Sequence, residues 1–546
     1  MELSGLGVPI LVAVSFALSV TGLYIFIVAL SHNLLWSQDE GANVIFPPGE
    51  ENAPEEPAAS GEEARGLRAV TQGRQAQEGE LADRIAADRS SATAVFVFLV
   101  LGALWLVIGS IAGLIASLTI HMPDWLAAYA PLTFGRMRVV HLNVVVYGWV
   151  SMTEMGIALW LLPRMLRTEL AASHYAIAGA AFWNSGLLLG VIAILFGWSD
   201  GLEYLEIPWQ IASLFVIGGA LTAIPLFLTL ARRRVQHLYV SVWYLGAALV
   251  WFPILFLIAK TPVHFGAEQA AMNWWYGHNV LAYWMTPLAL AAAYYLVPKV
   301  LGRPIYSYNL SLIAFWAQAL FYGQAGVHHL IGGPVPTWLV SVGVVASVMM
   351  VLPVLAFSVN YFQTLRGHWG TLRFSPTMRF VAIGAVSYVL VSLQGSLEAT
   401  RWFNTIVHFT HYTVAHAHLG LYGFVSFILF GAIYFAMPRI VDYEWPYPKL
   451  IAAHFWLSAV GFGIYFVALT IGGYLQGLAM MDAKRPFMES VALTVPYLEA
   501  RSLGGALMVL GHLIFVFHFL VMALRLGPRR DAPPMLGLQI WGGRTL

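Results

Sequence analysis

Cysteine is absent from all 546 positions of the chain. Its absence excludes disulfides, iron–sulfur clusters, heme attached covalently through a CxxCH motif, and any copper centre that needs a thiolate. A metal held by this chain must therefore be bound by histidine, carboxylate, tyrosine, methionine or backbone atoms.

Charged residues are also scarce. They make up 10% of the chain, whereas a typical soluble domain has about 25%. Hydrophobic residues make up 59%, and the mean hydropathy is +0.73. We therefore expect an all-α, polytopic membrane protein that spans a lipid bilayer. The net charge is only +1, so nothing indicates a nucleic acid partner.

Thirteen apolar runs are long enough to cross a membrane. They cover residues 8–31, 93–119, 137–163, 174–198, 207–231, 238–260, 275–301, 309–331, 337–363, 378–396, 403–438, 450–475 and 500–526. The first run lacks a convincing small-residue cleavage site, so we expect it to remain as a membrane helix. Residues 36–92 are polar and lack apolar periodicity, which predicts a flexible loop or short helical hairpin outside the membrane. A regulatory or partner-binding insert is the alternative.

Basic residues gather in alternate loops, which predicts the orientation. These loops contain Arg164 and Arg167; Arg232, Arg233 and Arg234; Lys299 and Arg303; Arg366, Arg373 and Arg379; Arg439 and Lys449; and Arg525, Arg529 and Arg530. Basic loops face the cytoplasm. An odd number of spans then places the N-terminus outside and the C-terminus inside, with the 36–92 insert on the cytoplasmic side.

Within the segment His411–His418, His416 and His418 lie two positions apart. Each residue of an α-helix turns by about 100°, so these two side chains point about 200° apart. One helix could therefore ligate two separate groups, one on each face. Core packing is a poor explanation, because a membrane interior penalises polar side chains.

Four more histidines fall at a similar depth in this topology. His141 and His278 begin spans that enter from outside, whereas His328 and His329 end a span that exits there. We expect all six histidines to converge toward the outer face. Two could saturate a heme iron, one could leave a second heme iron open, and three could hold copper or non-heme iron beside it.

Several segments together resemble the catalytic subunit of the heme-copper oxidase superfamily, and most closely its C-type branch, the cytochrome cbb-type oxidases. They are Phe134–Asn143, Trp274–Asn279, Tyr294–Lys299, Arg303–Tyr308, Gly326–Leu330 and His416–His418. The resemblance implies a twelve-helix heme-copper core over residues 93–546. One extra membrane helix in residues 1–35 and the insert at 36–92 would precede this core.

The resemblance also implies a role for each histidine. His141 and His418 would be the axial ligands of a low-spin heme b. His416 would be the proximal ligand of a high-spin heme, which would also be b-type. The copper ligands would be the remaining three: His278, His328 and His329.

Tyr322 is the next candidate catalytic residue. In the C-type family, a tyrosine six residues before the His-His pair supplies an electron and a proton for O–O cleavage and is cross-linked to a copper histidine. Tyr322 precedes His328 by six residues and His329 by seven. Seven residues are close to two helical turns, so we expect Tyr322 and His329 to share a face. An ordinary interfacial tyrosine is the alternative.

Three positions bear on the choice between oxygen and nitric oxide. Nitric oxide reductases of this superfamily carry a glutamate four residues after the first metal histidine, where this chain has Ala282. That difference favours copper and oxygen. The C-type family has a Glu-Gly pair where this chain has Gln394 and Gly395, and Glu398 one turn further on could compensate. The segment His418–Gly423 leans toward the reductase pattern.

Arg136, Arg138 and His408 are weaker candidates. The two arginines lie just before His141 and could pair with heme propionates, although a plain interfacial arginine would look the same. His408 matches a family histidine near the propionates.

The resemblance implies a terminal oxidase that reduces O2 to water and conserves energy as a proton gradient, in the inner membrane of a bacterial or archaeal cell. A membrane-anchored c-type cytochrome subunit would deliver electrons from a soluble donor such as cytochrome c. The alternative is a nitric oxide reductase that makes N2O from two NO with heme and non-heme iron. A non-enzymatic electron conduit would leave the three copper histidines unexplained.

Overall fold

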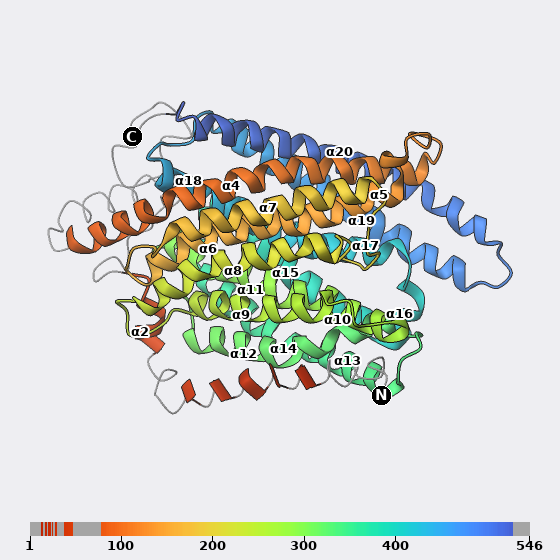
Figure 1. Ribbon diagram of the computed structural model, residues 1–546, viewed down its shortest axis with the longest axis horizontal. Helices are drawn as coiled ribbons and strands as arrows, with labels where there is room; N and C mark the ends of the chain where they lie inside the picture. The colour runs from red at the N-terminus through yellow and green to blue at the C-terminus, as the bar shows by residue number, and fades with distance from the viewer. Residues whose placement is uncertain are drawn as a thin grey trace.

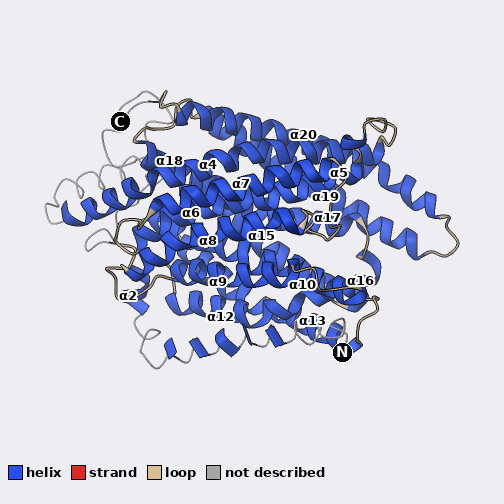
Figure 2. Ribbon diagram, in the orientation of Figure 1, coloured by secondary structure: helices blue, strands red, loops and turns tan. Residues whose placement is uncertain are grey.

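The computed structural model describes residues 38–46 and 78–527, together with short helical pieces between residues 13 and 29. The predicted first span at 8–31 is described only in those pieces, and most of the 36–92 insert lies outside the described residues. Within them the chain is helical and contains no strand (Figure 2). The predicted all-α class is therefore confirmed.

Twelve helical stretches among the described residues are long and apolar enough to cross a membrane. They form one bundle of roughly parallel and antiparallel helices (Figure 1). In chain order the helices are α4 (Glu78–His121), α5–η4–α6 (Phe134–Asn143, Val144–Val150, Ser151–Met165), α7 (Ser173–Leu195), α8 (Trp209–Ala231), α9 (Val240–Lys260), α10–η5–α11 (Gly266–Val280, Leu281–Met285, Thr286–Leu301), α12–η6 (Tyr308–Ala325, Gly326–Leu330), α13–α14 (Thr337–Met349, Val351–Leu365), α15 (Pro376–Glu398), α17–η8–α18 (His411–His418, Leu419–Ser426, Phe427–Val441), α19 (Lys449–Met481) and α20 (Phe487–Ala523).

Three of the twelve spans form the centre of the bundle. The most apolar windows of Phe134–Met165, Gly266–Leu301 and His411–Val441 are 94%, 94% and 89% buried, whereas those of the other nine spans are 33–61% buried. These three spans carry four of the six candidate histidines. Each also contains a π-helical segment: η4, η5 or η8. Polar ligands are thus kept away from lipid, where they would be costly.

Helix α4 begins earlier than the apolar pattern predicts. It starts at Glu78 instead of 93, so the end of the polar insert continues as helix toward the membrane. Asp88 in this extension accepts hydrogen bonds from Trp160 Nε1 (2.8 Å) and Arg164 Nη1 (2.6 Å). These contacts attach the extension to α6.

The predicted span 403–438 is interrupted near its start. A short helix, α16 (Arg401–Val407), ends before Phe409, which has φ 62°. Helix α17 then begins at His411, where the Thr410 hydroxyl accepts from the Tyr412 backbone N–H at 3.2 Å. The predicted single span therefore consists of two helices separated by this break.

A second short helix, α2 (Gln38–Asn43), lies at the end of the bundle opposite α16 (Figure 1). Lys299 Nζ donates to the carbonyl of Ile45 at 3.1 Å, and His237 Nε2 lies 2.7 Å from Glu40 Oε2. Part of the predicted insert is therefore packed against the bundle.

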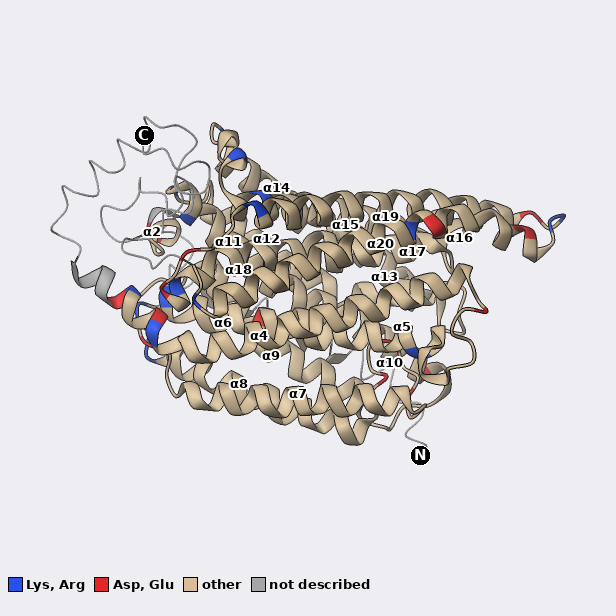
Figure 3. Cartoon of the chain, turned by 90° about the horizontal axis from the view of Figure 1, so that it is seen from above, with Lys and Arg blue, Asp and Glu red and all other residues tan. Residues whose placement is uncertain are grey.

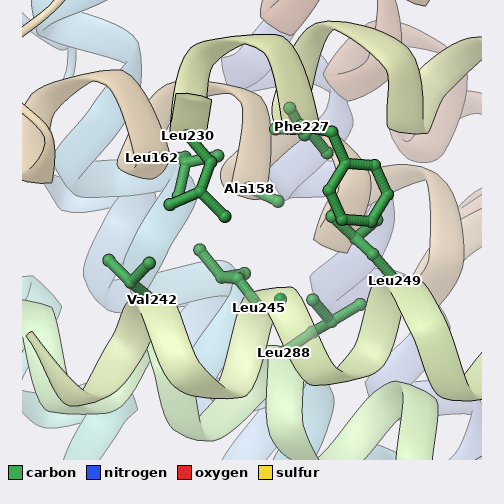
Figure 4. A pocket seen from close by; sticks show the side chains of 10 residues that line it. Ala158, Leu162, Phe227, Leu230, Val242, Leu245, Leu249 and Leu288 are labelled. Atoms are coloured by element: carbon green, nitrogen blue, oxygen red, sulfur yellow. The ribbon is translucent and has the colours of Figure 1, made fainter. Parts of the chain in front are cut away.

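One pocket lies between α6, α8, α9 and α11 (Figure 4). Its lining is apolar and includes Ala158, Leu162, Phe227, Leu245 and Leu288. It offers no polar side chain for binding or catalysis.

Candidate functional site

Three histidines form a cluster that could hold a metal ion. His278 comes from α10, and His328 and His329 come from η6. Their candidate ligand atoms all lie within 4.8 Å of one another. The ring centroids are 4.4–5.6 Å apart. Three imidazoles around one point suit copper or another borderline metal and leave positions open for a further ligand.

The local fold brings the two elements of this cluster unusually close. A Cβ on Gly326 would lie 2.8 Å from the Cβ of His278 and 3.0 Å from the carbonyl of Trp274, so glycine is required there. The Trp274 ring stacks on His329 with centroids 4.3 Å apart. Close approach of η6 to α10 thus sets the spacing of the three rings.

Hydrogen bonds fix which nitrogen of His328 is free. The Ser347 hydroxyl lies 2.8 Å from His328 Nδ1 and donates its hydrogen to the carbonyl of Gly343 at 2.7 Å. Since that hydroxyl has only one hydrogen, it must accept from Nδ1–H. The Nε2 lone pair is therefore left for a metal. His278 Nδ1 is buried and has no hydrogen-bond partner, as expected of a ligand atom.

Tyr322 lies beside the cluster, although not against the expected histidine. Its ring centroid is 4.9 Å from that of His278. The α-helical spacing from which we predict a shared face for Tyr322 and His329 does not continue as far as His329. Helix α12 ends at Ala325 and tightens into the 3-10 turn η6, which changes the rotation between the two residues.

A second pair of histidines, His141 and His418, faces across a gap. Their rings are nearly parallel, with an interplanar angle of 11° and centroids 6.1 Å apart. Two metal–imidazole bonds of about 2 Å each, plus the distance from each nitrogen to its ring centre, would span about this separation. The rings therefore fit the two axial positions of one iron.

The unused nitrogens of this pair are held by backbone. His141 Nδ1 donates to the carbonyl of Gly109 and His418 Nδ1 to that of Val414, both at 2.8 Å. Both Nε2 atoms are therefore free to ligate, and the Tyr465 hydroxyl lies 3.1 Å from that of His418. A Cβ on Gly113 would lie 2.6 Å from the His141 ring, so this glycine allows α4 to pack against the ligand.

His416 faces α15 instead of His141. Its Nδ1 lies 3.4 Å from Gln394 Oε1 and 3.6 Å from Glu398 Oε1. Gly395 packs on the ring, since a Cβ there would be 3.0 Å from His416 Cε1. Glu398 is buried and its Oε1 has no hydrogen-bond partner. His416 and His418 of α17 thus point to different parts of the bundle, as their spacing predicts.

The three weaker candidates, Arg136, Arg138 and His408, lie in different surroundings. Arg136 Nη1 donates to the carbonyl of Leu195 at 2.7 Å, and Arg138 Nη2 pairs with Glu203 Oε1 at 2.5 Å. Both guanidinium groups therefore already have protein partners. His408 lies in the break between α16 and α17, where burial lowers its pKa.

Ala282 is fully buried, and its carbonyl accepts from Gln318 Nε2 at 2.9 Å. The position thus presents a methyl group where the nitric oxide reductase pattern would place a carboxylate.

Sequence reasoning missed three residues of this region: Ser347, Tyr465 and Arg501. Serine and tyrosine are common in membrane helices, so nothing in the sequence distinguishes the first two. Arg501 did carry a signal, because an arginine inside an apolar span is rare and usually functional.

The chain was compared with known proteins. A family model described as cytochrome C and quinol oxidase polypeptide I matches residues 93–507. The cbb3-type cytochrome c oxidase subunit CcoN1 of Stutzerimonas stutzeri is 32% identical over 439 residues, which cover 77% of this chain and 92% of that protein. A cytochrome c oxidase subunit 1 homolog of Agrobacterium tumefaciens (strain T37) is 30% identical, covering 78% and 82%.

A solved structure of a heme-copper terminal oxidase dimer has a similar fold. Its TM-score is 0.68 at 16% identity, and the match covers 83% of this chain and 87% of that one. At this identity the likeness supports the fold alone.

Proposed function

The chain belongs to the cytochrome c and quinol oxidase polypeptide I family, the subunit I family of heme-copper oxygen reductases, and from this we propose how its residues carry out the reaction. The chain would reduce O2 to water, using electrons that pass through a low-spin heme to a second heme opposite copper. The observation that carries the proposal is the cluster of His278, His328 and His329 beside Tyr322.

The residues present fit two hemes and one copper ion. His141 and His418 would hold a low-spin heme b, and His416 would hold a high-spin heme of b-type. The copper would be held by the remaining cluster: His278, His328 and His329. When bound, the open heme and the copper supply the redox chemistry, while the bis-histidine heme can only pass electrons.

The chain's own residues orient the heme ligands and keep the site dry. One short helix carries both His416 and His418, so it fixes the relative positions of the two heme ligands. Gln394 Oε1 can accept from His416 Nδ1–H at 3.4 Å, which would hold its Nε2 toward the open heme. Glu398 Oε1 lies 3.6 Å from the same nitrogen, beyond hydrogen-bond distance.

Tyr322 would supply a proton and an electron from its hydroxyl during O–O cleavage. Its hydroxyl lies close to Thr286, at the start of α11. Further along α11, Tyr294 stacks on Tyr244 with centroids 5.9 Å apart, and both hydroxyls are buried without a hydrogen-bond partner. These hydroxyls mark a route by which protons could reach Tyr322 from the cytoplasmic end of α11.

Electrons would come from a membrane-anchored c-type cytochrome subunit that is reduced by a soluble cytochrome c. Covalent heme needs cysteine, which this chain lacks, so that heme must be on another chain. Lys and Arg gather mainly at the end of the bundle around α2 (Figure 3). By the positive-inside rule that end is cytoplasmic, in the inner membrane of a bacterial or archaeal cell.

Nitric oxide reduction is the rival activity. It would use non-heme iron and would need a carboxylate near the three-histidine cluster. Ala282 occupies the expected position, and Glu398 lies behind His416 instead. The curated relatives are named as oxidases. Both observations favour oxygen and copper.

The first test combines metal analysis of the purified complex with O2 and NO consumption from the same donor. We expect one copper for two hemes and fast, cyanide-sensitive O2 uptake. One additional non-heme iron, no copper, and dominant NO uptake would overturn the proposal.

Replacing Tyr322 by phenylalanine tests the catalytic residue. The variant should keep copper and both hemes but lose O2 turnover by about 10²-fold or more, because a proton donor is removed. Tyr175→Phe, on the exposed face of α7, is the matched control and should turn over normally. Unchanged turnover in Tyr322→Phe would remove that residue from the mechanism.

A further inference from the structure

Three further histidines, His454, His512 and His518, are buried in the bundle in addition to the six candidate ligands. Their exposed fractions are 0%, 4% and 0%. Helix α20 carries two of them and packs against α4, α18 and α19 (Figure 1). Ionisable side chains are costly inside a membrane, and those that occur there often relay protons. The function proposed above gives these three histidines no role.

The hydrogen bonds of His512 have a defined direction. The Ser110 hydroxyl on α4 lies 2.7 Å from His512 Nδ1 and donates its one hydrogen to the carbonyl of Leu106 at 2.6 Å. It must therefore accept from Nδ1–H, which leaves Nε2 to accept from the Tyr422 hydroxyl on η8 at 2.8 Å. A proton that passes from Tyr422 to Nε2 can thus be matched by release of the proton on Nδ1.

His454 and His518 continue this row toward the loop between α18 and α19. The Tyr434 hydroxyl on α18 lies 3.0 Å from His454 Nδ1, and the ring centroids of Tyr434 and His518 are 6.4 Å apart. His518 Nε2 donates to the carbonyl of Pro446 in that loop. The sequence predicts a cytoplasmic location for the loop. The row therefore begins at the cytoplasmic end of the bundle.

Two polar atoms in the middle of the row have no hydrogen-bond partner. They are His454 Nε2 and the Ser458 hydroxyl oxygen, and both are buried. Ser458 follows His454 by one turn of α19, so the two groups share a face, and its hydroxyl also lies close to that of Tyr422. A Cβ on Gly511 would lie 3.0 Å from Ser458 Oγ, so α20 closes the other side. Buried polar groups are rarely left unpaired, and one water between His454 and Ser458 would join the two halves of the row.

We propose that this row conducts protons from the cytoplasmic end of the bundle to Ser110. Twelve residues separate Tyr422 from Tyr434, so the row covers about 18 Å of an apolar layer that is about 30 Å thick. Each transfer forms one N–H or O–H bond as the next one breaks, so one proton moves and no electron is exchanged. The row ends beside the low-spin heme site, because Gly109, the residue before Ser110, accepts from His141 Nδ1–H. The inference rests on the proposed function, since O2 reduction would supply the energy for proton movement.

The row is separate from the hydroxyls that lie beneath Tyr322. Those hydroxyls belong to α9 and α11, whereas the row uses α4, η8, α18, α19 and α20. The row supplies protons that are moved outward across the membrane, and the hydroxyls beneath Tyr322 supply those consumed with O2. Blocking the row therefore lowers the number of protons moved per electron without a matching loss of O2 uptake.

The test uses the whole purified complex in sealed lipid vesicles, with potassium and valinomycin present, and records O2 uptake together with external acidification. His454→Phe removes both ring nitrogens but keeps an aromatic ring beside Phe380, Phe430 and Phe515. We expect the number of protons released outside per electron to fall severalfold, while O2 uptake with an uncoupler stays close to that of wild type.

A second variant with a matched control covers the case in which His454→Phe does not assemble. Ser458→Ala removes only the hydroxyl between the two halves of the row, and the proton ratio should again fall. Thr470→Val is the control, because it also removes a buried α19 hydroxyl that has no hydrogen-bond partner, and it should keep the wild-type ratio.

The outcomes separate this inference from the proposed function. A wild-type proton ratio in His454→Phe overturns the inference, as does a loss of O2 uptake with an unchanged ratio. If only Ser458→Ala assembles, an unchanged ratio in that variant overturns it. Wild-type vesicles that take up O2 but release no protons would also overturn it and leave the proposed oxidase standing. A wild-type complex without O2 uptake would refute the proposed function itself.

Discussion

At the residue scale, the candidate ligands are defined by which imidazole nitrogen is left free. Backbone carbonyls hold the Nδ1 atoms of His141 and His418, and Ser347 holds that of His328. Such hydrogen bonds set the tautomer, orient the ring and raise its basicity. The metal centres therefore depend on residues that do not touch the metal.

Ser347→Ala tests this dependence for the copper site. Loss of the acceptor for His328 Nδ1–H should weaken copper binding by about 10–100-fold. Copper retained during dialysis against graded chelator measures the effect, with heme content unchanged. Ser358→Ala is the control, because its hydroxyl, like that of Ser347, donates to a carbonyl four residues earlier in a helix, but it forms no hydrogen bond with a histidine of the described residues. Equal copper retention in the two variants would contradict the prediction.

Glu206, in the loop before α8, predicts a pH dependence of stability. Burial and the nearby Glu203 raise its pKa from 4.5 to about 7, although Asn143 Nδ2 donates to it at 2.8 Å. Between these values the folded state binds a proton that the unfolded state has lost. Stability should therefore fall as pH rises through this window, by about 3 kcal/mol in total.

Glu206→Gln removes this titration. The variant should be more stable than wild type at pH 8, and the difference should vanish toward pH 4.5. Thermal unfolding in detergent at several pH values measures the difference between the two proteins. A difference that is independent of pH would count against the raised pKa.

At the element scale, the decisive feature is the change from α-helix to 3-10 turn at Gly326. It places two consecutive histidines beside α10, where Tyr322 also lies near His278. The α-helical periodicity assumed from the sequence does not continue through this turn. The π-helical segments in the three central spans likewise change the register of the side chains that follow.

Gly326→Ala tests the packing of η6 on α10. The added Cβ would overlap His278 and Trp274, so we expect a cost of about 1–3 kcal/mol and loss of copper. Thermal unfolding and copper content are the measurements. Gly246→Ala in α9 is the control, since nothing lies within 4 Å of its added Cβ and alanine favours helix. Normal copper in Gly326→Ala would show that the turn tolerates the displacement.

At the scale of the whole molecule, the three most buried spans carry four of the six candidate histidines. The nine surrounding spans face lipid with apolar side chains and shield the centre. Helices α19 and α20 continue beyond the rest of the bundle at one end as a paired extension (Figure 1). The basic loops predict the orientation of the bundle in the membrane.

The absence of cysteine allows a direct test of orientation. Lys484→Cys lies in the loop between α19 and α20, and Arg233→Cys lies in the loop between α8 and α9; both positions are exposed. A membrane-impermeant maleimide should label Lys484→Cys in spheroplasts, and Arg233→Cys only after the membrane is opened. Wild type, with no cysteine, should remain unlabelled. The opposite labelling pattern would invert the predicted topology.

The sequence alone determined the membrane class, the family and the twelve spans of the core, because the length of an apolar run and the spacing of ligand residues can be read from the residue order. The spacing of His416 and His418 likewise predicts two opposed ligand directions from helix geometry alone.

Only the tertiary structure decided which residues support the ligands. The break before His411 and the turn at Gly326 depend on packing against α19 and α10, which the local sequence does not reveal. Ser347 and Tyr465 are brought to their histidines from the neighbouring spans, 19 and 47 residues along the chain. Such contacts depend on how helices cross, and one sequence by itself does not specify which helix faces cross.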